Sequence, residues 1–241
     1  MELFIGDEGD LAHAAARRFT AVLGATSLVP RIGLATGKSP RLTYEILRAL
    51  HAEKEINLCS AVWVMLDEYI GLPPSHSRRF EEELRNTLFG GLPRDAVSLI
   101  VPPSNDPQDP ETIGQFGQIV ADEPVQLQVL GIGRNGHIGF NEPGSLFGSR
   151  TRIVSLSETT LQDMAHEAWS GVEMPTTAVT QGLADIMGAQ EILLLAIGNA
   201  KFEAMRRAFR EPQSVECPAS VLQTHPNLKV LVTPDLARAF R

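Results

Sequence analysis

Residues 31–50 read RIGLATGKSPRLTYEILRAL and contain the unit from which the fold is predicted. Residues 31–35 form a short apolar run that is typical of a buried strand. Residues 41–51 carry apolar side chains at helical spacing, and Pro40 suits the first turn of that helix. A glycine-containing loop joins the two segments. The stretch therefore predicts a strand, a loop and an amphipathic helix.

The same alternation of short apolar runs and amphipathic stretches continues along the chain. The other predicted strands are residues 62–66, 98–101, 125–131, 152–156, 192–197 and 229–232. The other predicted helices are residues 10–23, 77–89, 112–121, 160–169 and 200–210. This pattern predicts a Rossmann-like α/β fold: a single doubly wound, mostly parallel sheet with helices on both faces. With 241 residues, we expect one α/β domain over residues 1–241.

Composition and charge restrict the class of protein. Hydrophobic residues make up 43% of the chain, which is enough to build a sizeable core. The formal net charge of -8 argues against nonspecific binding to nucleic acid or to an anionic membrane. No secretory signal or membrane-spanning run is visible, so we expect a cytoplasmic protein. Cys59 and Cys217 form neither a disulfide framework nor a metal-ligand cluster, and packing roles are expected for both.

The loop after the first of these strands has the features of a phosphate cradle. In a doubly wound sheet, ligands bind outside the carboxyl ends of the strands. Here Thr36, Gly37, Lys38 and Ser39 lead from strand to helix. Gly37 lets the backbone approach an anion, and the free N–H groups at a helix N-terminus favour a phosphate. GLATGKS is one residue short of a Walker A motif, which argues against a nucleotide P-loop. An ordinary turn capped by Ser39 is the alternative.

Two adjacent acids, Asp67 and Glu68, follow the apolar run of residues 62–66. Acids directly after a buried strand are unfavourable unless they reach solvent, a ligand or a hydrogen-bond network. A solvated turn is one interpretation, and a general base at the mouth of the sheet is the other. Adjacent residues of an extended strand point to opposite sides, so only one of the two should face a site.

Residues 125–145, VQLQVLGIGRNGHIGFNEPGS, contain a literal G-x-G-x-x-G from Gly131 to Gly136. A dinucleotide-binding motif needs a helix that opens at the third glycine and an acid that ends the next strand. Gly139 and Pro143 interrupt any helix here, and the next predicted strand offers no acid at its end. We therefore interpret the match to the dinucleotide motif as accidental.

The same loop carries Asn135, His137, Asn141 and Glu142 within eight residues. A lone histidine is more often a satisfied structural residue than a catalyst. A histidine with an amide and a carboxylate in the same glycine-rich loop is different, because a nearby acid orients the imidazole for proton transfer. The loop is therefore a candidate acid–base site.

With these loops in place, the chain resembles the glucosamine-6-phosphate deaminase family, which includes the related galactosamine-6-phosphate deaminases. The matching segments occur in the family's order: LATGKSP, MLDEYIGLP, GIGRNGHIGFNEPGSLFGSRTR, MPTTAVTQGLADIMGAQEILLLAIGNAK and PASVLQTHP. The resemblance implies an enzyme that isomerises and deaminates an amino-sugar 6-phosphate, first of all glucosamine 6-phosphate, to fructose 6-phosphate and ammonia. It implies no cofactor and no metal, a small-molecule partner, and a monomer or small homo-oligomer.

The resemblance also implies roles for individual residues. Asp67 matches the base that moves the substrate proton, His137 the ring-opening acid–base, and Glu142 the carboxylate that supports it. Asn135 stands where the family has Asp or Asn, and it belongs to the same catalytic set. The implied residues for binding the substrate and its phosphate are Thr36, Gly37, Lys38, Ser39, Gly136 and Lys201.

The chain departs from the family pattern at two positions. The phosphate-binding arginine expected in the helix after SRTR is absent, and His166 lies near its place. Its absence leaves open whether the substrate is the glucosamine or the galactosamine epimer. Val154 stands where allosteric members have a basic residue, which predicts activity without allosteric control.

Two other functions are alternatives to this interpretation. A 6-phosphogluconolactonase shares the fold and a similar loop, but its loop typically continues from His into Thr-Ala-Ser-Leu-Phe rather than into Phe-Asn-Glu-Pro. The sensing domains of sugar-responsive transcription regulators bind sugar phosphates without turnover, and they predict a helix-turn-helix segment and a basic face. This chain is acidic and has Asp67, His137 and Glu142, which a simple binding domain would not need.

Overall fold

A central parallel sheet organises the computed structural model, which describes residues 1–25, 28–104, 109–165, 169 and 171–240. The strand order is β1-β10-β9-β6-β2-β3-β5, and every neighbouring pair is parallel. The strands are β1 (Glu2–Ile5), β2 (Arg31–Leu34), β3 (Val62–Met65), β5 (Ser98–Ile100), β6 (Leu127–Leu130), β9 (Ile192–Ala196) and β10 (Leu228–Val232). The predicted mostly parallel sheet is therefore confirmed.

The order of the strands creates a topological switch point between β2 and β6. From β2 the chain runs through β3 to β5 at one edge, returns to β6 on the other side of β2, and continues to β9 and β10. Loops that leave the carboxyl ends of β2 and β6 therefore diverge to opposite faces of the sheet, and a crevice opens between them.

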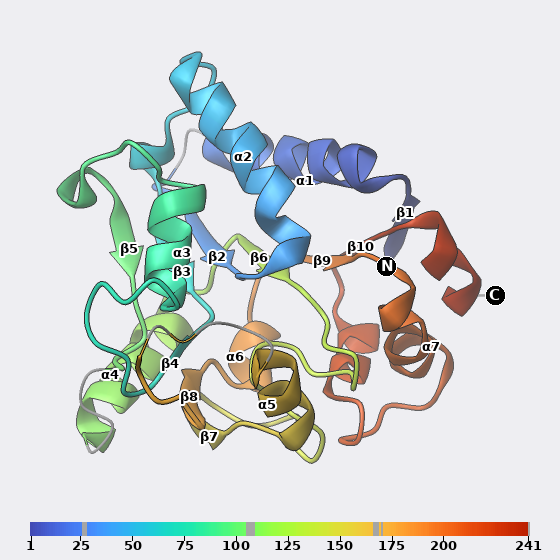
Figure 1. The fold of residues 1–241 in the computed structure, drawn as a ribbon. Coiled ribbons are helices and arrows are strands. Elements are labelled where there is room, and N and C mark those ends of the chain that lie inside the picture. Colours follow the sequence, from blue (N-terminus) through green and yellow to red (C-terminus); the bar gives the residue numbers. More distant parts are fainter. Residues whose placement is uncertain (26–27, 105–108, 166–168, 170, 241) are drawn as a thin grey trace.

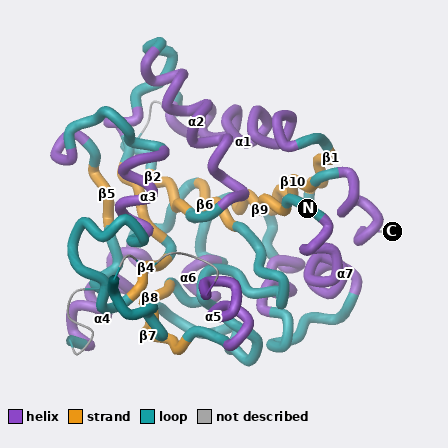
Figure 2. Tube along the Cα trace, in the orientation of Figure 1, coloured by secondary structure: helices purple, strands orange, loops and turns teal. Residues whose placement is uncertain are grey.

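Helices cover both faces of this sheet, as predicted (Figures 1 and 2). One face carries α1 (Glu8–Leu23), α2 (Lys38–Ala52) and α3 (Phe80–Thr87). The other carries α4 (Pro110–Asp122), α6 (Leu183–Ile186) and α7 (Phe202–Arg210). Alternate strand residues serve the two cores: Trp63 packs with the first group and Val64 with the second. Among the described residues, no helix is long and apolar enough to cross a membrane.

The helices begin in two different ways. Asp7 and Asp10 form a capping box at the start of α1, in which each side chain accepts a bond from the other's backbone N–H. By contrast, the N-cap of α2 is Gly37, which has a φ of 88° and contributes no capping side chain. This φ is strained for any residue with a Cβ, which accounts for the glycine. α2 begins before the predicted residue 41, so Lys38 and Ser39 lie in its first turn and Ser39 is not the N-cap.

A second, antiparallel sheet makes the prediction of a single sheet incomplete. It consists of β4 (Asp67–Tyr69), β8 (Thr177–Thr180) and β7 (Arg152–Ser155), with β8 in the middle. The predicted strand of residues 152–156 belongs here rather than to the parallel sheet. The chain passes from the carboxyl end of β3 almost directly into β4 (Figure 1), so the acids at residues 67 and 68 are held by sheet pairing rather than by a free loop.

Helix α5 (Glu158–Ala165) follows β7 and corresponds to the predicted helix of residues 160–169. Residues 166–168 of that prediction, including His166, lie outside the described residues.

Candidate active site

A cavity of about 1200 Å³ opens at the carboxyl edge of the central sheet. The segments that follow β2, β3, β6 and β9 all contribute to its wall. It therefore lies at the switch point, where a doubly wound sheet binds its ligand. The predicted site residues that line it are Thr36, Gly37, Lys38, Ser39, Asp67, His137 and Lys201.

Asp67 stands where β3 ends and β4 begins, and its side chain lines the cavity. The residue is only 7% exposed. Burial raises the pKa of the carboxyl to about 8, and the charges of Glu68 and Glu83 act in the same direction. A carboxylate with a raised pKa is a stronger base once it has lost its proton, so this position suits proton abstraction from a weakly acidic carbon.

Glu68, the next residue, is not among the residues that line the cavity. Its carboxylate accepts hydrogen bonds from the backbone N–H groups of Tyr69, Phe80 and Glu81 at 2.9, 3.0 and 3.0 Å. The guanidinium of Arg79 lies 3.8 Å away. Burial nevertheless raises the pKa of Glu68. The expected division of the acid pair is thus observed: one acid faces the cavity, and the other fixes the start of α3.

His137 lines the cavity, and its acid partner lies behind it. Nδ1 of His137 is 3.3 Å from Oε2 of Glu142. The amide of Asn135 donates to the same oxygen at 2.7 Å, and its own oxygen accepts from the His137 backbone N–H at 3.1 Å. Thr160, from α5, donates to the other carboxylate oxygen. The arrangement occupies Nδ1 and leaves Nε2 as the ring nitrogen for a substrate.

The hydrogen bonds to Glu142 determine its charge. Burial alone would raise the pKa of this carboxyl, but the hydrogen bonds it accepts and the neighbouring imidazole lower the pKa to about 2. Glu142 is therefore a fixed anion near neutral pH, and it can stabilise an imidazolium at His137. Asp67 and Glu142 thus differ in kind: one is poised to exchange a proton, and the other to stay ionised.

Two glycines shape the loop that carries the histidine. A Cβ at Gly133 would lie 2.3 Å from the His137 ring, so the imidazole packs directly on this backbone. Gly136 has a φ of 91°, and a Cβ there would lie 2.6 Å from Sγ of Cys217. Gly136 is not among the residues that line the cavity, so the structure does not bring this predicted binding residue to the site. Turns rather than a helix follow these glycines, as expected for an accidental dinucleotide match.

A helix terminus and basic side chains line another part of the cavity. Lys38 is the first residue of α2 and is exposed, and Ser39 follows it. Lys201 ends a short turn, η3 (Asn199–Lys201), after β9. The N-terminus of α2 and these two lysines thus bring positive charge to the wall of the cavity in an acidic protein. Other basic residues that line the cavity are Arg41, Arg78 and Arg134.

Two polar residues of the site were missed from the sequence. Thr160 supports Glu142, but no motif marks it, because its role depends on how α5 packs. Glu83 lies in α3, and its carboxylate accepts a hydrogen bond from the Gly37 N–H at 2.9 Å. It is the last of three consecutive glutamates, and helical periodicity alone does not show which of them faces a ligand.

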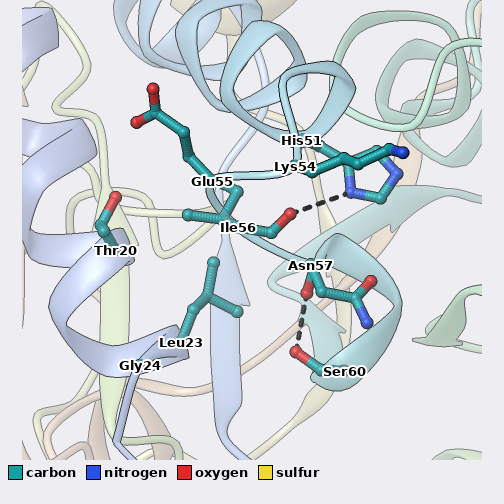
Figure 3. A pocket seen from close by; sticks show the side chains of 9 residues that line it. All are labelled: Thr20, Leu23, Gly24, His51, Lys54, Glu55, Ile56, Asn57 and Ser60. Carbon is teal, nitrogen blue, oxygen red and sulfur yellow. Dashed lines mark hydrogen bonds between the residues drawn. The ribbon is translucent and has the colours of Figure 1, made fainter.

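A smaller cavity of about 480 Å³ lies between the ends of α1 and α2, and it shares no lining residue with the larger cavity. Figure 3 shows its lining, which includes His51, Lys54 and Asn57. The polar groups there complete local turns: Ser60 donates to the Asn57 carbonyl at 2.7 Å, and His51 accepts from the Leu58 N–H at 3.3 Å. Within the described ranges, no group of three or more His, Cys, Asp or Glu side chains is placed to hold a metal.

Comparison with known proteins gives the family. Residues 6–231 match the family described as glucosamine-6-phosphate isomerases/6-phosphogluconolactonase. A glucosamine-6-phosphate deaminase of Cutibacterium acnes is 42% identical over 243 residues, which cover 100% of this chain and 92% of that protein. A glucosamine-6-phosphate deaminase of Rhodopirellula baltica is 40% identical over 198 residues, covering 82% of this chain and 79% of that protein.

Solved structures agree with this assignment. A monomeric glucosamine-6-phosphate deaminase superimposes with a TM-score of 0.89 at 32% identity, with 100% of both chains covered. A 6-phosphogluconolactonase from Trypanosoma cruzi gives a TM-score of 0.78 at 15% identity, with 98% of this chain and 96% of that chain covered, which shows a shared fold. The chain therefore belongs to the family of glucosamine-6-phosphate isomerases and 6-phosphogluconolactonases.

Proposed function

We propose that the protein converts glucosamine 6-phosphate and water to fructose 6-phosphate and ammonia. The observation that carries this proposal is the placement of Asp67 and His137 on one cavity, with the pKa of Asp67 raised to about 8. Relatives named glucosamine-6-phosphate deaminase, at about 40% identity, support the same reaction.

The first step opens the sugar ring. A cyclic sugar must become an open-chain aldehyde before C1 and C2 can exchange a proton. His137 takes the proton of the C1 hydroxyl and delivers one to the ring oxygen, so the bond between C1 and the ring oxygen breaks. Glu142 stabilises the imidazolium that forms on the way, and Asn135 holds both groups in place.

The second step moves a proton from C2 to C1. Asp67 takes the C2 proton, which gives an enolamine, and returns that proton to C1. In the same step the amino nitrogen gives up one proton and O1 gains one, so C1 becomes a hydroxymethyl group. The product is an imine at C2, to which water adds before ammonia leaves. The burial that raises the pKa of Asp67 makes it basic enough for a carbon acid. Each step is a proton transfer, an addition or an elimination, so the residues of this chain are sufficient for it.

The phosphate is assigned to the other end of the cavity. Lys38 and Lys201 supply the charge, and Gly37 and Ser39 donate through backbone and hydroxyl groups. Together, these phosphate-binding groups take the place of the arginine that the family pattern expects near His166. A lysine is a point charge without the bidentate fork of arginine, so binding rests on charge and is sensitive to salt.

The proposed substrate also bears on where the protein acts in the cell. We propose that residues 1–241 act as one domain, as a monomer or small homo-oligomer, in the cytoplasm. Phosphorylated sugars are doubly charged and do not cross lipid membranes unaided, so an enzyme that consumes them works where they are made.

A direct assay distinguishes the candidate reactions. The protein is incubated separately with glucosamine 6-phosphate, galactosamine 6-phosphate and 6-phosphogluconolactone, and release of ammonia and of acid is measured. Ammonia from the glucosamine ester at the highest rate is the expected result. Faster ammonia release from the galactosamine ester would reassign the epimer, and acid release from the lactone without ammonia from either amino sugar would reject the proposal.

A further inference from the structure

The phosphate end of the cavity contains an anion that belongs to the protein itself. Oε1 of Glu83 accepts a hydrogen bond from the Gly37 N–H at 2.9 Å. Gly37 is the N-cap of α2, a helix of 15 residues, and it has no side chain of its own to cap it. No acidic residue lies in the first turn of α2. A carboxylate from α3 therefore stands at the positive end of α2, where the substrate phosphate is proposed to bind.

The same side chain faces the proton-transfer end of the site. Glu83 lines the cavity together with Asp67, and its charge helps to raise the pKa of that aspartate. It thus lies within electrostatic reach of both functional ends. The negative charge of Glu83, close to that of Asp67, disfavours the further negative charge that a bound phosphate brings.

Its neighbours on α3 behave differently. Glu81 and Glu82 both form ion pairs with Arg94, at 3.3 and 2.5 Å. Within the part of the chain that the structure describes, Glu83 forms no ion pair. Its hydrogen-bonding partner is a backbone N–H of the proposed phosphate cradle, which a bound phosphate would also use.

We propose that Glu83 is an internal competitor of the substrate phosphate, which holds the Gly37 N–H in the free protein and leaves it when phosphate binds. One N–H group makes one strong hydrogen bond, so the two anions exclude each other there. A phosphate dianion gains more from Lys38, Lys201 and the helix terminus than a single carboxylate does, and it displaces Glu83. A monoanion is attracted less strongly by these positive groups, so it does not displace Glu83. The competitor thus makes the cradle selective for dianions.

This inference rests on the proposed phosphate site, and it is tested by binding of inorganic phosphate, which requires no turnover. Isothermal titration compares wild type, Glu83→Gln and Glu83→Ala with the control Glu53→Gln. Glutamine keeps an oxygen that can accept from Gly37 but loses the charge. Glu53 is an exposed glutamate at the far end of α2, so its variant matches the change in net charge.

We expect Glu83→Gln and Glu83→Ala to bind phosphate about three- to tenfold more tightly than wild type, as for loss of one like charge near a partly solvated site. Glu53→Gln should match wild type. A purely structural role predicts the opposite sign for Glu83→Ala, because a loosened cradle binds phosphate more weakly. Unchanged or weaker binding in Glu83→Gln, or no phosphate binding by any variant, would overturn the inference. If the protein does not catalyse the proposed reaction, the phosphate-binding comparison still tests the role of Glu83.

Discussion

The two ends of the cavity are constructed on different principles. At the proposed proton-transfer end, Glu142 accepts bonds from three side chains, and Asp67 is 7% exposed at the junction of two strands. At the proposed phosphate end, Lys38 is exposed, and the Gly37 N–H is bonded by one carboxylate from another helix. Proton transfer requires groups fixed within hydrogen-bonding reach, whereas charge attraction tolerates movement. We therefore expect the first end to be rigid and the second to be adaptable.

This difference predicts what substitutions should do. Changes at the rigid end should lower turnover and leave affinity almost intact, because those groups act in the transition state. Changes at the adaptable end should alter affinity more than turnover, because the phosphate contact is the same in ground and transition states.

The largest effect is expected for Asp67→Asn. An amide keeps the shape of the side chain but cannot accept the proton, so turnover should fall by on the order of 100- to 10,000-fold. Substrate binding, measured by titration calorimetry, should stay near that of wild type. A variant that keeps more than about a tenth of the wild-type rate would remove Asp67 from the mechanism.

The next effect separates ring opening from proton transfer. His137→Gln should slow the reaction of the cyclic substrate by about 100-fold, a typical contribution of a positioned acid–base group. The loss should be much smaller with an acyclic substrate, or in the reverse direction from the ketose phosphate. Steady-state rates on both kinds of substrate provide the comparison. Equal losses would assign His137 to a later step or to the fold alone.

At the adaptable end, Lys38→Ala should raise KM by about tenfold with little change in kcat. The increase should be smaller at high ionic strength, where salt screens the charge of the lysine in the wild type as well. Kinetics at two ionic strengths test this. If KM is unchanged at both, Lys38 points into solvent and another cation holds the phosphate.

The smallest effect concerns stability. The ordinary pKa of an aspartate, 3.8, applies to the unfolded chain, whereas the folded pKa of Asp67 is about 8. Between these values the unfolded state has lost a proton that the folded state keeps, so this group lowers the free energy of unfolding as pH rises. Asp67→Asn has no carboxyl at this position, so its free energy of unfolding does not fall for this reason. Its midpoint of thermal unfolding should exceed that of wild type by on the order of 5 °C at pH 8, and by less at pH 5.

Thermal unfolding followed by circular dichroism between pH 5 and pH 9 measures this difference. The advantage of the variant should grow up to about pH 8 and then level off, because both states of the wild type are ionised above the folded pKa. Asp95→Asn, at an exposed aspartate outside the cavity, is the control. If the difference in unfolding midpoint between Asp67→Asn and wild type shrinks as the pH rises, the burial of Asp67 does not destabilise the folded protein.

Sequence periodicity predicted the central sheet because its inner strands are buried on both faces. β9 reads ILLLA and is wholly buried, so it appears as a continuous apolar run. β1 was missed because its four residues are all exposed at the sheet edge. β4 and β8 were missed because such short strands depend on nonlocal pairing, Asp67 with Thr180 among them. Strand order, and with it the switch point, is likewise a property of the folded chain.

The candidate site was predictable to the extent that it is local in the chain. Asn135, His137 and Glu142 share one loop, and their contacts follow from that proximity. The opposite orientation of Asp67 and Glu68 follows from strand geometry. The contacts of Thr160 and Glu83 join elements that are distant in sequence, so only the packed structure reveals them.

The central claim is that Asp67 carries the proton between C2 and C1, and exchange with solvent tests it most directly. Fructose 6-phosphate and ammonium are incubated with the protein in D₂O, and deuterium incorporation at C1 is followed by NMR. Wild type should incorporate deuterium, and His137→Gln should still do so through the open-chain ketose. Asp67→Asn should incorporate almost none. Incorporation by Asp67→Asn at the wild-type rate would contradict the account, because another group would then be moving the proton.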